Sequence, residues 1–254
     1  MSEVRFKDHF SQQAERYSNC RPRYPEDLFR YLTSLVSRHE CAWDCATGNG
    51  QAALGLTPFF DRVIATDASG NQIAHAIPYE KISYRIAPAE HTTLTTHSVD
   101  LIIVAQALHW FDFNKFYDEV RRIGRERSVL AASCYGGVTV DDNIDVILRR
   151  YEHKILGQYW PPERRYVDER FKTIPFPFEE IRSPLFMLEH SWDMETLLSY
   201  LASWSATKRY EEGRHENPID LIRKDVQIAW GNPKAKKLVR WQLNLRVGRV
   251  DAKD

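Results

Sequence analysis

The chain has 254 residues, and its 35 basic and 35 acidic side chains cancel to a formal net charge of zero. Such a balance gives no broad field that would attract nucleic acid or an anionic membrane, and no apolar run approaches the ~20 residues of a membrane span. The four cysteines form no C-x-x-C pair, and the N-terminus has no signal-peptide core. We therefore expect a cytoplasmic monomer or homodimer that needs no metal, nucleic acid or membrane.

The N-terminal region, about residues 1–38, is expected to be helical with a break at 21–25. Pro25 followed by two acids suits the first turn of a helix, because the helix dipole favours negative charge there. The apolar residues that follow keep the spacing of a buried stripe: Leu28, Tyr31, Leu32 and Leu35.

The segment Cys41–Gly50 predicts a short buried strand and a tight turn, followed by a helix over 51–60. Gly48 and Gly50 allow a ligand to approach the backbone closely, as in sites for nucleoside-containing ligands. The spacing also fits the relaxed G-x-G-x-x-A form of the dinucleotide fingerprint. Asp44, at the strand end, would repel a pyrophosphate and instead favours a ligand that is cationic at that point.

A second buried strand, 62–67, ends in Asp67, 19 positions after Gly48. An acid at about this distance accepts hydrogen bonds from ribose hydroxyls in nucleotide sites. The alternative is a helix cap, although Ser69 could serve as one. Two strand-end acids around the glycine turn favour the ligand-binding interpretation.

The run Asp44-Cys45-Ala46-Thr47-Gly48-Asn49-Gly50 resembles motif I, D/E-x-G-x-G-x-G, of class I S-adenosylmethionine-dependent methyltransferases, with Ala46 in place of the first glycine. The segment 17–25, Y-x-x-x-R-P-R-Y-P, is similar to a stretch that folds over the cofactor in many small-molecule members. The alternative for this segment is a helix break with solvated arginines. The resemblance implies S-adenosylmethionine as cofactor, bound by Tyr17, Arg23, Asp44, Ala46, Thr47, Gly48, Asn49, Gly50, Asp67, Ala68, Ala89, Glu90, Ala105 and Gln106.

A third strand is predicted over 82–87, and the resemblance places the following Pro88-Ala89-Glu90 beside adenine; a solvated loop glutamate is the alternative. The apolar run 99–104 predicts a strand buried on both faces. It leads into A-x-x-x-H-W-F-D, which is similar to the group that contains fungal trans-aconitate and cantharidin methyltransferases. The Asn/Asp-Pro-Pro-aromatic motif of enzymes that methylate bases is absent here, which argues against a nucleic-acid substrate.

A helix over 113–124 and a fifth strand over 128–134 are expected next, and the strand–helix alternation then stops. Residues of about 138–180 are charged, helix-prone and rich in aromatic residues, including Tyr159 and Trp160. An insertion here would lie at the carboxyl ends of the strands, so we interpret it as a lid over the substrate. The alternative is the core of a small helical subdomain.

The remaining elements are a strand over 181–190, a helix over 195–203 and a closing strand over 237–250 whose apolar and polar residues alternate. That alternation favours the antiparallel last strand of a methyltransferase over the parallel end of a dehydrogenase. We expect one α/β domain over 1–254: a Rossmann-like seven-stranded sheet, order 3-2-1-4-5-7-6 with the last strand antiparallel, flanked by helices and carrying a helical insertion.

The predicted activity is methylation of a small molecule, and a small carboxylate is favoured because the relatives with His-Trp at this position methylate acids. His109 is then expected to position the acceptor, with Trp110, Tyr159, Trp160 and Arg246 as further substrate residues. Alternatives are O-, N- or C-methylation with His109 as base, or a histidine that merely packs beside Trp110. Alternatives from other functional classes are an NAD(P)-dependent oxidoreductase and an inactive cofactor-binding module.

Overall fold

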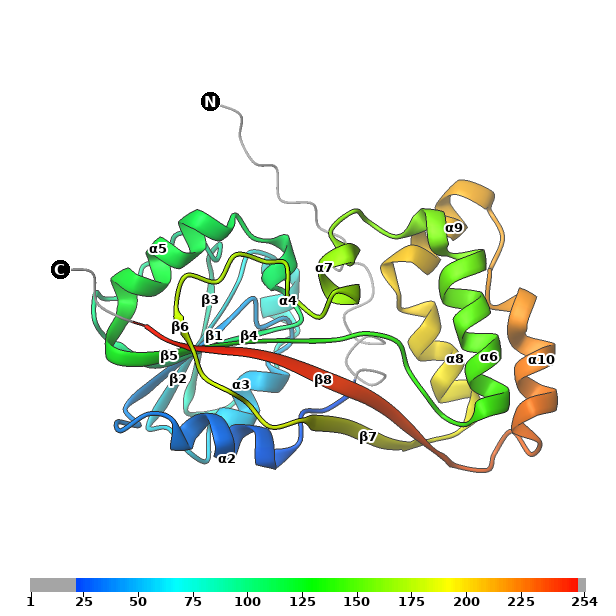
Figure 1. The fold of residues 1–254 in the computed structure, drawn as a ribbon, viewed down its shortest axis with the longest axis horizontal. Coiled ribbons are helices and arrows are strands. Elements are labelled where there is room, and N and C mark those ends of the chain that lie inside the picture. Colours follow the sequence, from blue (N-terminus) through cyan, green and yellow to red (C-terminus); the bar gives the residue numbers. More distant parts are fainter. Residues whose placement is uncertain (1–21, 251–254) are drawn as a thin grey trace.

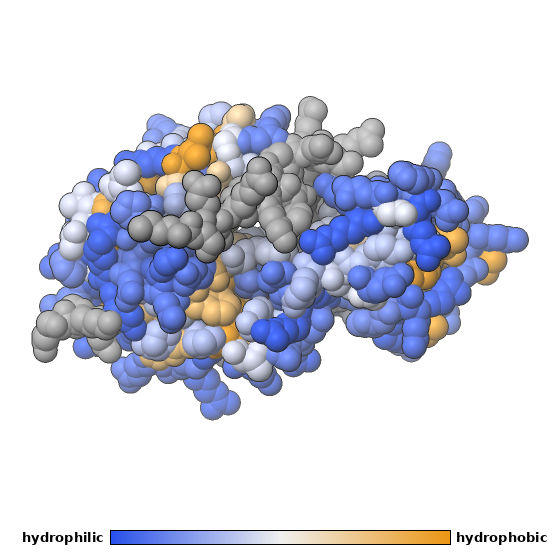
Figure 2. Space-filling view, turned by 90° about the horizontal axis from the view of Figure 1, so that it is seen from above, coloured by the Kyte–Doolittle hydropathy of each residue, from blue (hydrophilic) through white to orange (hydrophobic). Residues whose placement is uncertain are grey.

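The computed structural model describes residues 22–250. These residues form two lobes: a twisted sheet covered by helices, and a group of helices at one end of it (Figure 1). Three long strands connect the lobes, namely β5 (Gly124–Tyr135), β7 (Phe186–Trp192) and β8 (Lys237–Arg249). The face seen in Figure 2 is mainly hydrophilic, with apolar residues in small groups.

The first part of the sheet is parallel and consists of β1 (Cys41–Cys45), β2 (Arg62–Asp67), β3 (Ile82–Ile86), β4 (Val99–Ala105) and β5. Every residue of β1 and all but the last of β4 are buried, as their apolar composition predicts for strands covered on both faces. Because these strands are parallel, their carboxyl ends meet along one edge.

The strand order is β3-β2-β1-β4-β5-β8-β6, and β7 also pairs with β8. The last strand, β8, is antiparallel to β5, so the predicted methyltransferase topology is confirmed. Within residues 22–250 the sheet has eight strands: the strand expected over 181–190 corresponds to β7, which begins only at Phe186, and the additional two-residue strand β6 (Glu179–Glu180) precedes it. Pro184 lies in the gap, and proline has no N–H to donate to a strand ladder.

Helices cover both faces of the sheet (Figure 1). On one face, α2 (Glu26–Ser34) and α3 (Gln51–Leu56) pack on one apolar core, in which the stripe residues Leu28 and Leu32 are fully buried. The other face carries α5 (Phe113–Ile123), whose Phe116 and Val120 pack in a second core. The short α4 (Gly70–Ala74) follows β2.

The helical lobe is built from two separate chain segments. The first contains α6 (Asp142–Arg150), a π-helical turn η3 (Tyr151–Ile155), a 3-10 turn η4 (Gly157–Tyr159) and α7 (Arg164–Asp168). The second, between β7 and β8, contains α8 (Met194–Ala202), α9 (Ser205–Arg214) and α10 (Asp220–Trp230). The insertion predicted over 138–180 therefore corresponds to the first segment, and the helix predicted over 195–203 packs beside it as part of the same lobe (Figure 1).

No helix within residues 22–250 is long and apolar enough to cross a membrane. Cys41, Cys45 and Cys134 are buried free thiols, and Cys20 lies outside the described residues.

Candidate active site

The turn after β1 depends on backbone conformations that few residues adopt easily. Ala46, Gly48 and Gly50 have φ angles of 55°, 58° and 91°, all in the left-handed region. Gly50 also lies against Tyr84, because a Cβ atom at position 50 would be 2.1 Å from the Tyr84 hydroxyl oxygen. Ala46 occupies the position of the first motif glycine in the same left-handed conformation, which costs an L-residue roughly 1–2 kcal/mol.

Asp44 is fully buried at the end of β1 and has one unsatisfied oxygen. Its Oδ2 accepts a hydrogen bond from Thr47 Oγ1 at 2.5 Å, whereas Oδ1 has no partner among the described residues. Burial raises the pKa of the carboxyl group to about 7, against the opposing effect of the hydrogen bonds from Thr47 and the Ala53 backbone. A cationic ligand group at Oδ1 would supply the missing partner and favour the charged form.

Asn49 has the complementary defect on the same turn. It is buried, and its Nδ2 donor has no partner in residues 22–250. Buried polar groups are normally hydrogen-bonded, so an orphaned acceptor and an orphaned donor on one turn point to a ligand with both a cationic and an anionic group. The amino-acid part of S-adenosylmethionine has this combination of an ammonium and a carboxylate.

Asp67, at the end of β2, is held beside this turn. Its carboxylate accepts hydrogen bonds from the backbone N–H groups of Gly48, at 2.9 Å, and Ser69, at 2.8 Å. Ser69 caps α4 through its own side chain, so the cap role does not fall to Asp67. Each carboxylate oxygen can accept more than one bond, and contact of Asp67 with the ribose hydroxyls remains a prediction. Ala68 follows it and is half-buried.

Two further loops complete this edge of the sheet. After β3, Ala89 is buried and Glu90 accepts a hydrogen bond from the Asp112 N–H at 2.9 Å, which ties this loop to the one after β4. β4 ends at half-buried Ala105, and Gln106, whose φ is 60°, follows it. We refer to residues 44–50, 67–69, 88–90 and 105–106 as the loop edge.

The side chain of Gln106 joins the ends of β4 and β5. Its Nε2 donates to the Tyr135 carbonyl at 3.1 Å, and its Oε1 accepts from the Tyr135 N–H at 2.8 Å. This double contact fixes where β5 leaves the sheet. Contact of Gln106 with the cofactor remains a prediction.

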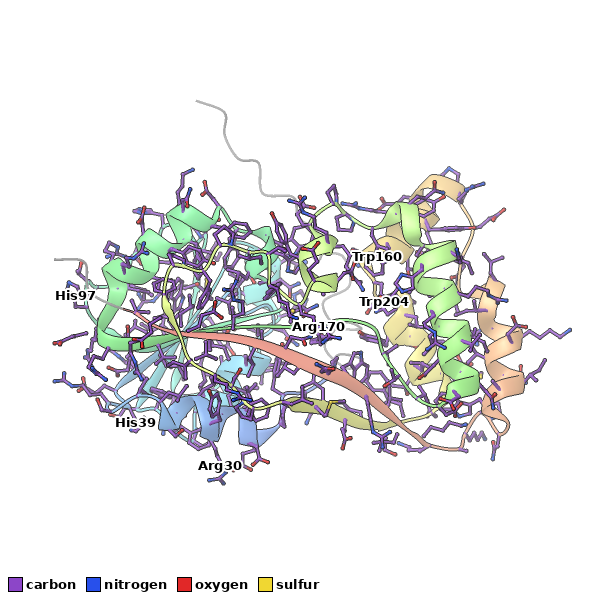
Figure 3. The ribbon with its side chains drawn as sticks, in the orientation of Figure 1. Arg30, His39, His97, Trp160, Arg170 and Trp204 are labelled. Atoms are coloured by element: carbon purple, nitrogen blue, oxygen red, sulfur yellow. The ribbon has the colours of Figure 1, made fainter. Side chains whose placement is uncertain are left out.

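A cavity of about 90 Å³ lies between the lobes, beside the loop edge. We call it the interlobe cavity; five of its twelve described lining residues are Trp or Tyr, and four chain segments contribute to it. Trp160 and Trp204, side by side with ring centroids 5.4 Å apart, mark its helical-lobe side in Figure 3. The lining residues are Gln106, His109, Trp110, Tyr135, Gly136, Trp160, Pro161, Arg164, Val167, Tyr200, Trp204 and Ser205.

His109 is held in this wall by a 3-10 turn, η2 (Leu108–Trp110). The ring is 7 % exposed and packs between Trp110 and Phe171, with centroids 4.8 and 5.8 Å away. Burial, together with the positive charge of Arg164, lowers its pKa to about 3. His109 is therefore a neutral ring at physiological pH, and its Nδ1 has no hydrogen-bond partner among the described residues.

Arg164 brings a cation to the same cavity. Its Nε donates to Asp168 at 2.7 Å, its Nη2 to Glu152, and its guanidinium lies 4.1 Å from the centroid of the Trp160 ring. Burial alone would lower the pKa of Arg164, but the two carboxylates outweigh it and raise the pKa above its usual value. The cation is thus permanent.

Several residues predicted for the site lie elsewhere. Arg246 does not line the interlobe cavity: it donates to the carbonyls of Phe171 and Ile174 and pairs with Glu180, which fastens this segment to β8. This is a structural role, so the prediction that Arg246 contacts substrate gains no support.

Tyr159 also lies outside the wall of the cavity, and accepts a hydrogen bond from Arg214 at 3.1 Å. The exposed Arg23 donates its backbone N–H to His190 on β7 at 2.8 Å, and its contact with the cofactor stays a prediction. Tyr17 lies outside the described residues.

Sequence reasoning missed Arg164, Tyr135, Tyr200 and Trp204 as cavity residues. Arg164 is one of many charged residues in a segment without clear periodicity, and nothing in that pattern distinguishes it. No group of three or more His, Cys, Asp or Glu side chains in residues 22–250 could hold a metal ion.

The comparisons with known proteins agree with this geometry. Residues 43–132 match the family model of a methyltransferase domain. A Dictyostelium discoideum protein named as a candidate methyltransferase is 32 % identical over 231 residues, which cover 89 % of this chain and 88 % of that protein. A solved structure from Anaeromyxobacter dehalogenans, named as a candidate type II methyltransferase, is 41 % identical with a TM-score of 0.86, and covers 92 % of this chain and 99 % of that one.

The Saccharomyces cerevisiae protein CRG1, whose name presumes an S-adenosylmethionine-dependent methyltransferase, is 27 % identical over 128 residues, 47 % of this chain and 44 % of CRG1. The likeness to the first two proteins extends over both lobes and is not confined to the cofactor motif. Together with the sheet order, it decides against the oxidoreductase alternative. The chain belongs to the class I S-adenosylmethionine-dependent methyltransferases, and S-adenosylmethionine is its cofactor.

Proposed function

We propose that this protein methylates a carboxylate oxygen of a small organic acid bound in the interlobe cavity. The observation that carries the proposal is the lack of a competent base in the cavity wall. Among the lining residues that the structure describes there is no Asp or Glu, and His109 is the single histidine. With a pKa of about 3, His109 is a very weak base and cannot take a proton efficiently at neutral pH.

The chemistry sets what the acceptor must bring. S-adenosylmethionine supplies a methyl group on a positively charged sulfur. The chain has to hold the acceptor about 3–3.5 Å from that carbon and in line with the leaving sulfur. A hydroxyl, ammonium or carbon acid must also lose a proton to a nearby base, whereas a carboxylate is already ionised at neutral pH.

The walls suit such an acceptor in two further ways. Five of the described lining residues are Trp or Tyr, and apolar surroundings accelerate a reaction in which opposite charges meet and disappear. The neutral His109 ring, locked between Trp110 and Phe171, can donate one N–H and so orient an acid without deprotonating it. His109 is then a positioning residue.

The test is a panel of acceptors read by formation of S-adenosylhomocysteine. Small acids, including trans-aconitate, should be methylated in preference to phenols and amines of similar size. The rate should be flat from pH ~6.5 to 8.5, because carboxylates are ionised throughout this range and His109 stays neutral. His109→Gln should retain much of the activity, since glutamine can still donate a hydrogen bond.

Two results would contradict the proposal. One is a rate that rises with a pKa near ~6.5 in the parent and loses this step in His109→Gln, which would make His109 a base. The other is a preference for phenols or amines over every acid. Cofactor binding without turnover of any acceptor would instead support the inactive-module alternative.

A further inference from the structure

One nitrogen of Arg164 has no hydrogen-bond partner among the residues that the structure describes. Nε contacts Asp168 and Nη2 contacts Glu152, whereas Nη1 makes no hydrogen bond within residues 22–250. Nη1 is also not among the buried atoms that lack a partner, so it retains access to solvent. Because Arg164 lines the interlobe cavity, Nη1 is available as a charged donor to a molecule bound there.

The surroundings of Arg164 keep it in place. Glu152, 6 % exposed, lies in the π-helical turn η3, a type of turn that is rare and often found at functional sites. The same turn fixes the cavity wall, because Trp160 Nε1 donates to the Glu152 carbonyl at 3.0 Å. A buried ion pair contributes little net stability, so its presence here needs another explanation.

Two carboxylates share the positive charge of Arg164, and its effect still reaches the cavity wall. Asp168 is half-exposed, so water screens its charge, and Glu152 balances the guanidinium inside the protein. The positive charge of Arg164 acts on His109 in the cavity wall and is one of the two causes of the low pKa of His109. An anion in contact with Nη1 would therefore gain charge-assisted hydrogen bonds.

The anion bound by Arg164 should be a different group from the carboxylate that is methylated. The reacting carboxylate loses its charge during methyl transfer, so a cation bound to it would stabilise the reactant more than the transition state and slow the reaction. A cation bound to a second anionic group of the acceptor stabilises the reactant and the transition state equally. It anchors the acceptor without opposing the chemistry.

We propose that Arg164 forms an anion subsite in the interlobe cavity and that the acceptor is a dicarboxylate or polycarboxylate, with one carboxylate held by Arg164 and another methylated. This inference rests on the proposed function. Arg164 thereby selects acceptors by their second charge.

The test measures binding to the protein saturated with S-adenosylhomocysteine, so it does not depend on turnover. Calorimetry compares succinate, glutarate, adipate and trans-aconitate with monoamides of the first three, succinamate, glutaramate and adipamate, which have nearly the same shape and one charge less. The variant is Arg164→Gln combined with Glu152→Gln, because Arg164→Gln alone would leave a buried unpaired carboxylate. Arg164→Lys keeps the charge, and Arg165→Gln is the matched control on the same helix, exposed and bonded to Tyr166.

We expect at least one dicarboxylate to bind the parent about 10- to 100-fold more tightly than its monoamide, the range expected for one charge-assisted contact. The double variant should lose this preference while its affinity for the monoamide changes by less than about twofold. Arg165→Gln should keep the preference, and Arg164→Lys should keep part of it. A purely structural role for Arg164 would weaken both members of each pair equally.

Equal losses for both members, an undiminished preference in the double variant, or no dicarboxylate binding to the parent would overturn the inference. Turnover then separates the two proposals. If acids are methylated but the charge preference survives in the double variant, the anion subsite is wrong and the carboxylate acceptor stands. If phenols or amines are the acceptors, the proposed function fails and the subsite fails with it.

Discussion

The loop edge and the interlobe cavity lie next to each other but are built in opposite ways. The loop edge consists of short turns from residues 44 to 106, shaped by left-handed backbone at Ala46, Gly48 and Gly50. The interlobe cavity is formed by large side chains from both lobes, with Trp110, Trp160 and Trp204 on its wall. A constant cofactor can be bound by backbone geometry, whereas a variable acceptor is bound by side chains that can change without altering the sheet.

The largest effect is expected from Gly50→Ala, which should damage the loop edge through the backbone. The new Cβ would lie 2.1 Å from the Tyr84 hydroxyl oxygen, and the φ of 91° is unfavourable for alanine. We expect a loss of about 3 kcal/mol or more in the free energy of unfolding, measured by urea denaturation. Cofactor affinity should fall as well.

Gly48→Ala is the matched control, because its Cβ would meet nothing closer than 3.9 Å and only the backbone conformation is strained. It should cost about 1 kcal/mol. Adding Tyr84→Phe should recover part of the Gly50→Ala loss by removing the nearest atom. If Gly50→Ala is as stable as Gly48→Ala, close packing is not the reason for glycine at position 50.

Next in size is Trp160→Ala, which should damage only the acceptor side. The variant removes a wall of the interlobe cavity and the ring under Arg164, so kcat/KM for the acceptor should fall about 10- to 100-fold. The dissociation constant of S-adenosylmethionine should stay within about twofold. Tyr159→Ala truncates the neighbouring aromatic side chain, which is not on the cavity wall, and should spare acceptor turnover. A collapse of cofactor affinity in Trp160→Ala would show that the two regions are not separable.

Asp44→Asn should reveal a conflict between cofactor binding and stability at the loop edge. The folded pKa of about 7 lies above the usual pKa of an aspartate, so the stability present below pH ~4 is lost progressively as the pH rises to 7. The neutral variant escapes this loss, and without cofactor it should be about 1–2 kcal/mol more stable than the parent at pH 8, with no advantage at pH 4. Thermal melts at both pH values measure this.

The same variant should bind S-adenosylmethionine more weakly, because the cationic ligand loses its carboxylate partner. Binding of adenosine alone should change less. An equal effect on both ligands would place Asp44 away from the cationic part of the cofactor.

The smallest effect is expected from Ala46→Gly, which restores the residue usual in motif I. Glycine removes the left-handed penalty of roughly 1–2 kcal/mol at φ 55°, but costs about 0.5–1 kcal/mol through greater freedom in the unfolded chain. The net gain should be about 0.5–1 kcal/mol, seen as a higher melting temperature with unchanged cofactor affinity. A destabilised variant would mean that the Ala46 methyl group makes contacts worth more than the strain.

The amino-acid sequence alone determined the sheet and the loop edge. Buried strands 41–45 and 99–105 are mostly apolar, strand 62–67 has a buried apolar centre, and the alternation in 237–249 marks the antiparallel last strand. Asp44, Gly48, Gly50 and Asp67 follow directly from their positions at strand ends, because parallel strands place their carboxyl ends together. Local rules of burial and chain turning were sufficient for these positions, whereas the strand order was expected from the resemblance to the methyltransferase family.

Only the tertiary structure decided the composition of the interlobe cavity. Trp160 and Tyr159 are adjacent in sequence, yet one lines the cavity and the other does not, because the turn after η4 directs them apart. Arg164 and Arg246 look equivalent as isolated cations, but α7 carries Arg164 to the cavity while β8 commits Arg246 to Glu180 and two backbone carbonyls. The packing of two chain segments, separated by β6 and β7, sets these positions, and no spacing within either segment encodes that packing.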